Sequence, residues 1–100
     1  MTTNSLKTKL RREVVVPNRQ GLHLRVSDSI MKKAKEFDSN IRLFKGNNGA
    51  DGRRVIEIIA LGAAQGDAVT IEAEGVDAQE ALDAILELFA ARFDEDDDYH

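Results

Sequence analysis

The feature of the chain that most constrains its fold is a strand pattern followed directly by a helix pattern near the C-terminal end. Val69, Ile71 and Ala73 alternate with polar residues, which predicts a β-strand with one apolar face that ends at Gly75. The residues that follow have helical spacing and predict one buried stripe, formed by Ala78, Leu82, Ile85, Phe89 and Phe93. A one-sided strand needs a cover, and an amphipathic helix supplies one. We therefore expect a layer of sheet packed against a layer of helices.

Weaker patterns earlier in the chain add five further elements. They are a strand over 13–17, an amphipathic helix over 26–37, a strand over 41–43, a brief strand near 51–54 after a turn at 46–49, and a short helix over 55–61 that ends at Gly62. The order βαββαβα predicts an α+β fold, with a four-stranded, mainly antiparallel sheet and three helices on one face. We expect one domain over residues 11–93, a polar N-terminal extension over residues 1–10 and an acidic, disordered tail over residues 94–100.

Capping residues predict where two of the helices begin. The first amphipathic helix has two candidate N-caps, His23 and Ser27, and composition alone favours Ser27. Before the last helix, Asp77 is followed three residues later by Glu80, which resembles a capping box.

Charge is distributed unevenly along the chain. The formal net charge is −4, but residues 1–54 carry a balance of +8 and residues 55–100 a balance of −12. Without the five acidic residues at 94–98 the remainder carries +1, which does not indicate a nucleic-acid-binding protein. The simplest role of the acidic tail is to keep the protein in solution. The alternative is that it folds over the basic half of the chain and competes with partners.

The residue inventory excludes several classes of chemistry. The chain has no cysteine and so no disulfide, thiolate nucleophile or zinc–thiolate site. Its two histidines, His23 and His100, lie far apart in the sequence and predict no metal site. No apolar run is long enough for a secretion signal or a bilayer span. We expect a cytoplasmic protein without metal, cofactor or membrane insertion.

The run Gly21-Leu22-His23-Leu24-Arg25 is the strongest candidate site, because it sets an imidazole where a strand gives way to a helix. A helix start offers unpaired N–H groups and the positive end of the helix dipole, so a side chain there can carry a phosphoryl group in stabilising surroundings. Taken alone, His23 is more simply a histidine of an exposed loop. A cation such as Arg25 is slightly unfavourable at a helix start, which favours a functional role for it.

The chain resembles the histidine-containing phosphocarrier (HPr) family of the bacterial phosphotransferase system in two separated stretches. They are Asn18–Arg25 and Ala60–Asp67, and the second is followed in register by residues 69–75. The resemblance spans residues 13–93. It implies the open-faced β-sandwich of that family, with the histidine at the N-terminus of the first helix, and therefore favours a helix start at His23 over one at Ser27.

The resemblance also implies a function and a set of site residues. His23 would accept a phosphoryl group from phosphorylated enzyme I and pass it to an EIIA-type acceptor domain, and Arg25 would stabilise the added charge. Asn18, Gly21 and Leu24 would form the surroundings of the phosphate. The protein would be a carrier that is consumed and regenerated in a relay, not an enzyme, and it would act as a monomer because a relay needs small, transient interfaces.

Two residues depart from the family pattern. Val26 follows the motif arginine where the family usually has proline, which restores a backbone N–H and loosens the helix entry. Arg54 stands where many members carry a serine that a kinase phosphorylates, so this chain lacks that switch. The apolar helix that follows is expected to expose a docking patch for partners, formed by Arg54, Val55, Ile56 and Ile59.

Two alternative functions remain open. One is a regulatory, nitrogen-type phosphorelay carrier that is not linked to sugar uptake. The other is a binding module with the same fold that acts on a regulator through the surface of residues 55–61, with a histidine that is not phosphorylated. The presence of both His23 and Arg25 disfavours the second alternative.

Overall fold

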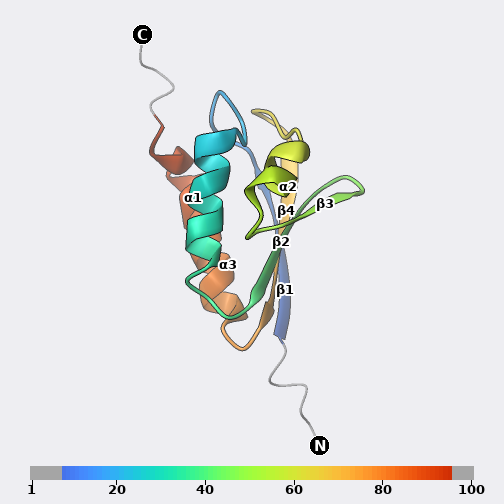
Figure 1. The fold of residues 1–100 in the computed structure, drawn as a ribbon, viewed down its shortest axis with the longest axis vertical. Helices are drawn as coiled ribbons and strands as arrows, with labels where there is room; N and C mark the ends of the chain where they lie inside the picture. The colour runs from blue at the N-terminus through green and yellow to red at the C-terminus, as the bar shows by residue number, and fades with distance from the viewer. Residues whose placement is uncertain (1–7, 96–100) are drawn as a thin grey trace, which may run out of the picture.

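The computed structural model describes residues 8–95, which form a four-stranded sheet with three helices against one face (Figure 1). The elements are β1 Thr8–Val15, α1 Leu24–Ala34, β2 Asn40–Lys45, β3 Asn48–Asp51, α2 Val55–Ala60, β4 Ala68–Gly75, α3 Ala78–Ala90 and a 3₁₀ turn over Arg92–Asp94. The strands lie in the order β1-β4-β2-β3, and neighbouring strands are antiparallel. The predicted α+β fold and its βαββαβα order are confirmed. Among the described residues no helix is long and apolar enough to cross a membrane.

The core follows from the alternation in the central strands. In β4, Val69, Ile71 and Ala73 are fully buried, while on the other face Thr70 and Glu74 are half-buried and Glu72 is 8% exposed. The stripe predicted for the last helix is buried throughout, at Ala78, Leu82, Ile85, Phe89 and Phe93. Strand alternation and helix periodicity therefore meet in one apolar layer between the sheet and the helices.

Several element boundaries differ from those predicted, and the differences in β1, β3 and α2 are the most informative. Strand β1 begins at Thr8, which pairs with Gly75, so the sheet includes three residues of the predicted N-terminal extension. The third strand occupies Asn48–Asp51 and not residues 51–54, because the turn of the hairpin closes over two residues, Gly46 and Asn47. Gly46 has φ of +59°, a conformation that favours glycine. Helix α2 ends one residue earlier than predicted, at Ala60, and is followed by Gly62 with φ of +64°.

Asp77 stands at the N-cap of α3 as predicted, but its side chain does not cap that helix. Its carboxylate instead accepts hydrogen bonds from the N–H of Asp38, the N–H of Ser39 and the Ser39 hydroxyl. The capping-box prediction is therefore wrong in its contacts. Asp77 fastens the loop between α1 and β2 to the start of α3, and local sequence spacing cannot reveal a partner about forty residues away.

Helix α3 ends in a turn with left-handed backbone. Arg92, Phe93 and Asp94 have φ of 56°, 55° and 61°. Such a conformation costs a non-glycine residue about 1–2 kcal/mol. Phe93 offsets part of this cost, because its ring is buried and packs edge-to-face on Phe89 with centroids 4.8 Å apart. The turn brings the last described residue, Glu95, to the N-terminal end of α1, where its carboxylate contacts His23.

Candidate functional site

His23 is the N-cap of α1, as the family resemblance predicts. Its backbone is extended, with φ of −79° and ψ of −176°, and its ring Nδ1 accepts a hydrogen bond from the N–H of Arg25 at 3.3 Å. The first backbone hydrogen bond of the helix runs from the N–H of Ser27 to the carbonyl of His23. The amides of residues 24–26 precede that bond and form the N–H-rich end of the helix.

Ser27, the other candidate cap, has a structural role inside the first turn. It is fully buried, and its hydroxyl donates to the carbonyl of Leu22 at 3.1 Å. Val26, which replaces the family proline, is 1% exposed and belongs to the core. Burial of Val26 therefore fixes the entry of the chain into α1 by packing, where proline would fix it through its ring.

The loop before His23 is held by close packing against the segment before β4. Gly21 has φ of +69°, and a Cβ added there would collide with the carbonyl oxygen of Ala63. That carbonyl accepts a hydrogen bond from the N–H of Leu22 at 3.0 Å. Asn18 is fully buried, and its Nδ2 donates to the Gly21 carbonyl at 2.8 Å. Glycine is therefore required at position 21, and the close packing that it allows fixes the position of His23 at the start of α1.

The carboxylate of Glu95 completes the site from the other end of the chain. Its Oε2 lies 2.7 Å from His23 Nε2 and 2.6 Å from a terminal guanidinium nitrogen of Arg25. Its Oε1 accepts a hydrogen bond from Asn18 Nδ2 at 2.9 Å. Because Nδ1 of His23 accepts from a backbone N–H and Nε2 faces a carboxylate, the proton of a neutral ring sits on Nε2.

The surroundings of Glu95 favour its ionised form. Burial by itself would raise the pKa of Glu95, but the hydrogen bonds from Asn18, His23 and Arg25, together with the charge of the ring when it is protonated, outweigh it and hold the pKa below its ordinary value. The Glu95 side chain is 8% exposed and that of Arg25 72% exposed. The anion is thus sheltered, while its arginine partner faces solvent.

Sequence reasoning missed Glu95, which the prediction assigned to the disordered segment 94–100. The structure describes Asp94 and Glu95, and the rest of that segment lies outside the described residues. A partial signal was present: Phe93 continues the apolar stripe of α3, so the chain had to stay packed to within two residues of Glu95. Within the acidic run 94–98, no local feature of the sequence indicates that Glu95 contacts the site.

The predicted docking residues lie on and beside α2. Ile56 is 76% exposed, Leu24 on the neighbouring start of α1 is 64% exposed, and Val55 and Ile59 are half-buried. Arg54 is the N-cap of α2 and makes no side-chain cap, but pairs with Glu57 in the first turn at 3.7 Å. Two large apolar side chains, one on each helix, thus face solvent.

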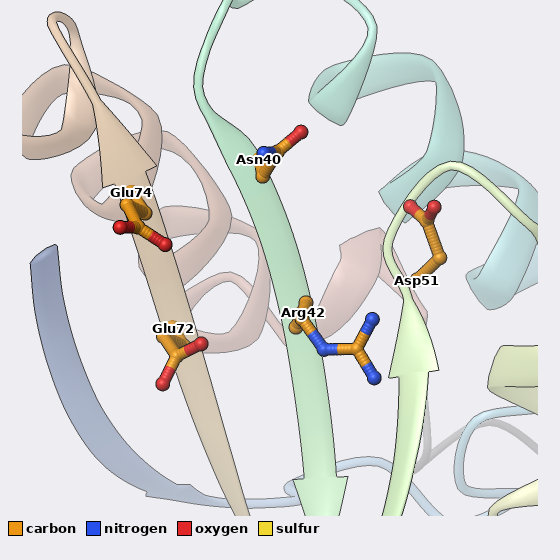
Figure 2. A pocket seen from close by; sticks show the side chains of 5 residues that line it. All are labelled: Asn40, Arg42, Asp51, Glu72 and Glu74. Atoms are coloured by element: carbon orange, nitrogen blue, oxygen red, sulfur yellow. The ribbon is translucent and has the colours of Figure 1, made fainter. Parts of the chain in front are cut away.

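Away from the His23 site, a hollow lies on the outer face of the sheet, on the side opposite the helices. Figure 2 shows its lining from three strands: Asn40 and Arg42 of β2, Asp51 of β3, and Glu72 and Glu74 of β4. None of these residues contacts His23. Within residues 8–95 no group of three or more histidine, cysteine or acidic side chains could hold a metal ion.

The site thus joins a nucleophilic imidazole nitrogen, the N–H-rich end of a helix, an arginine and a buried amide donor. These groups suit an anion that is bonded covalently to a ring nitrogen, and together with the fold they define the class of small histidine phosphocarriers.

Comparison with known proteins identifies the family. Residues 10–91 match the family described as "PTS HPr component phosphorylation site". The phosphocarrier protein NPr of Shewanella violacea is 39% identical over 88 residues, which cover 88% of this chain and 97% of that protein. The phosphocarrier protein HPr of Cupriavidus necator is 36% identical over 86% of this chain and 97% of its own length.

A solved structure agrees with these relatives. The crystal structure of HPr-C-His from Thermoanaerobacter tengcongensis superimposes with a TM-score of 0.83 at 31% identity, covering 87% of this chain and 98% of that one. The chain belongs to the HPr family of the phosphotransferase system. Members of this family are phosphocarrier proteins and not enzymes.

Proposed function

We propose that this protein carries a phosphoryl group on Nδ1 of His23, received from phosphorylated enzyme I and passed to an EIIA-type acceptor domain. One observation carries the proposal: Nδ1 accepts a hydrogen bond at the N-terminus of α1, while Nε2 faces the carboxylate of Glu95, and this pair of contacts assigns the ring proton to Nε2. Of the two ring nitrogens, Nδ1 is therefore the nucleophile.

The transfer needs no cofactor and no net proton movement. The bond between phosphorus and the donor side chain of enzyme I breaks as the bond between phosphorus and Nδ1 forms, and the ring keeps its proton on Nε2. Transfer to the acceptor reverses the exchange: the P–Nδ1 bond breaks, and His23 returns to the neutral ring. The phosphohistidine has a good leaving group, because the departing imidazole is neutral.

Stabilisation of the phosphoryl oxygens falls to groups at the start of α1. The amides of Leu24 and Val26 precede the first hydrogen bond of the helix and can donate to an anion there. The Arg25 amide donates to Nδ1 in the free protein and becomes available for the same role when Nδ1 binds phosphorus. Val26 supplies an N–H that a proline could not, so this chain has one donor more than the usual family pattern. The exposed guanidinium of Arg25 adds a charge-assisted hydrogen bond.

We assign partner docking to Leu24 of α1 and Ile56 of α2, which are exposed apolar side chains, with Arg54 at the edge of α2. A docking surface of so few side chains makes a small interface, which suits a monomeric carrier that has to release each partner quickly. Because Arg54 replaces the serine of many family members, the kinase-dependent switch at that position is absent.

The test is the intact mass of the protein after incubation with phosphoenolpyruvate and enzyme I. We expect the wild type to gain one phosphoryl group that is lost in acid, and His23→Ala to gain none. Arg25→Ala should gain it more slowly. An unphosphorylated wild type, together with binding to a regulator that persists in His23→Ala, would instead support the binding-module alternative.

A nitrogen-type regulatory relay is the second candidate, and the 39% identity to an NPr protein together with Arg54 favours it. The two candidates differ in the acceptor. Phosphorylated protein should be offered a nitrogen-type and a sugar-type EIIA domain in parallel, and the rate of phosphoryl loss should be measured for each. Faster transfer to the nitrogen-type domain is the result expected for a regulatory carrier, and faster transfer to the sugar-type domain would assign the protein to uptake.

A further inference from the structure

We propose that the carboxylate of Glu95 is an internal competitor for the phosphoryl group: it occupies the Arg25 and Asn18 donors in the free protein and has to leave Arg25 when His23 is phosphorylated. The inference rests on the proposed function of His23 and adds a control element to it. The Glu95 side chain would then report the state of the carrier, docked when His23 is free and released from Arg25 when it is phosphorylated.

The contacts of Glu95 are those of an anion seated in an anion site. One oxygen takes both the imidazole N–H and the guanidinium of Arg25, and the other takes the amide of Asn18. These donors belong to the loop 18–25 that precedes and begins α1, whereas Glu95 is 70 residues away in the chain from Arg25. The first turn of α1 contains no acidic residue of its own. A carboxylate from a remote part of the sequence therefore occupies the place where the proposed function requires a phosphoryl group.

The two anions exclude each other at Arg25. A phosphoryl group on Nδ1 carries close to two negative charges, and its oxygens need the guanidinium that Oε2 of Glu95 now holds. Like charges that share one partner repel strongly in sheltered surroundings, and the Glu95 side chain is 8% exposed. Arg25 has further N–H donors, but a carboxylate that stays on its guanidinium places a second negative charge beside the phosphoryl group, so phosphorylation favours departure of the carboxylate.

The backbone that delivers Glu95 is suited to release. Arg92, Phe93 and Asp94 all have left-handed backbone, which is unfavourable for Arg92 and Phe93. Backbone hydrogen bonds from the Asp94 N–H to the Ala91 carbonyl and from the Glu95 N–H to the Arg92 carbonyl close this turn. The buried Phe93 ring and the carboxylate of Glu95 are among the contacts that fasten it to the rest of the domain, so loss of the carboxylate contact weakens that attachment.

Competition has a reciprocal consequence. If the docked segment weakens phosphorylation, phosphorylation must weaken docking by the same factor, because the two are linked through one site. A protein that recognises the released segment would therefore recognise the phosphorylated carrier.

The test compares wild type with Glu95→Gln, which removes the charge and keeps the size of the side chain. The matched control is Asp94→Asn, which removes the same charge one residue earlier from an exposed side chain, and asparagine tolerates the left-handed backbone. Each protein is phosphorylated by enzyme I and, separately, by phosphoramidate, a small donor with no docking surface. In the chemical reaction the P–N bond of phosphoramidate breaks, ammonia leaves and the P–Nδ1 bond of His23 forms.

We expect Glu95→Gln to react about three- to tenfold faster than wild type with both donors. This range corresponds to the free energy of one partly exposed charge-assisted hydrogen bond. Asp94→Asn should stay within about twofold of wild type, since surface charges without partners have small effects. In wild type, the backbone amide of Glu95 should become more mobile by NMR relaxation once His23 is phosphorylated. Equal rates in Glu95→Gln and wild type, or a slower variant, would overturn the competition.

A titration with inorganic phosphate separates this inference from the proposed function. Phosphate binding is followed by NMR at the amides of residues 24–26, with no phosphoryl transfer involved. Tighter binding by Glu95→Gln than by wild type supports competition even if no donor phosphorylates His23. Equal binding in the two proteins overturns it even if His23 proves to be the carrier residue.

Discussion

Replacing Gly21 with alanine should disable the loop that presents His23. A Cβ at this position meets two penalties: φ of +69° and a collision with the Ala63 carbonyl oxygen. The first costs about 1–2 kcal/mol. Relief of the collision requires the loop and the Ala63 segment to separate, which breaks the hydrogen bond from Leu22 N–H and leaves a buried donor unpaired at about 1–3 kcal/mol.

The expected total is about 2–5 kcal/mol, a large part of the roughly 5–15 kcal/mol that stabilises a domain of this kind. Each kcal/mol should lower the melting temperature by about 4–8 °C at this chain length. Gly62→Ala is the matched control, because Gly62 has a similar φ of +64° but no atom within 4 Å of the added Cβ. The difference between the two variants isolates the collision.

Thermal and urea unfolding followed by circular dichroism measure both variants, and phosphorylation is measured on any Gly21→Ala that remains folded. We expect Gly21→Ala to be less stable than Gly62→Ala and to accept phosphate more slowly. If the two variants lose the same stability, the contact between the His23 loop and Ala63 does not hold the site, and the reasoning is refuted.

Three further predictions test other parts of the account. Phe93→Ala should destabilise the protein by about 3–5 kcal/mol in urea unfolding, since it empties a buried aromatic site, and a loss below about 1 kcal/mol would contradict that packing. Hydrogen bonds from the Ser39 hydroxyl and the Asp38 N–H hold the pKa of Asp77 below its ordinary 3.8. Its contribution to stability is therefore complete above that pH and is lost as the pH falls through the lowered folded-state pKa, so the stability difference between wild type and Asp77→Asn should shrink on acidification. Ile56→Ser should leave the melting temperature within about 2 °C, because the side chain is 76% exposed, but should slow phosphoryl transfer from enzyme I without changing the reaction with phosphoramidate; equal slowing with both donors would remove the docking role.

The parts of the fold that the sequence predicts are those in which local pattern and tertiary packing agree. The alternation of β4 and the stripe of α3 identify their own buried faces, and Gly62 marks the end of α2. The third strand was predicted too far along the chain, because the two glycines at 46 and 49 allow the hairpin to turn at more than one place. Only the pairing of β3 with β2 selects the turn at Gly46.

The site divides in the same way. His23, Arg25 and Asn18 are close in sequence, so one motif predicts all three. Asp77 and Glu95 act over long separations: Asp77 binds the backbone of Ser39, and Glu95 binds the loop before α1. An acidic residue beside other acidic residues carries no local sign of its partner, and its role is decided by where Phe93 anchors the chain.

The most direct test of the account is to locate the phosphoryl group on the ring of His23. Protein labelled with ¹⁵N is phosphorylated by enzyme I and phosphoenolpyruvate, and long-range proton–nitrogen NMR spectra of the imidazole are recorded before and after. The account predicts a ring protonated at Nε2 in the free protein and phosphorylated at Nδ1 afterwards. Phosphorylation at Nε2, or at a residue other than His23, would contradict it.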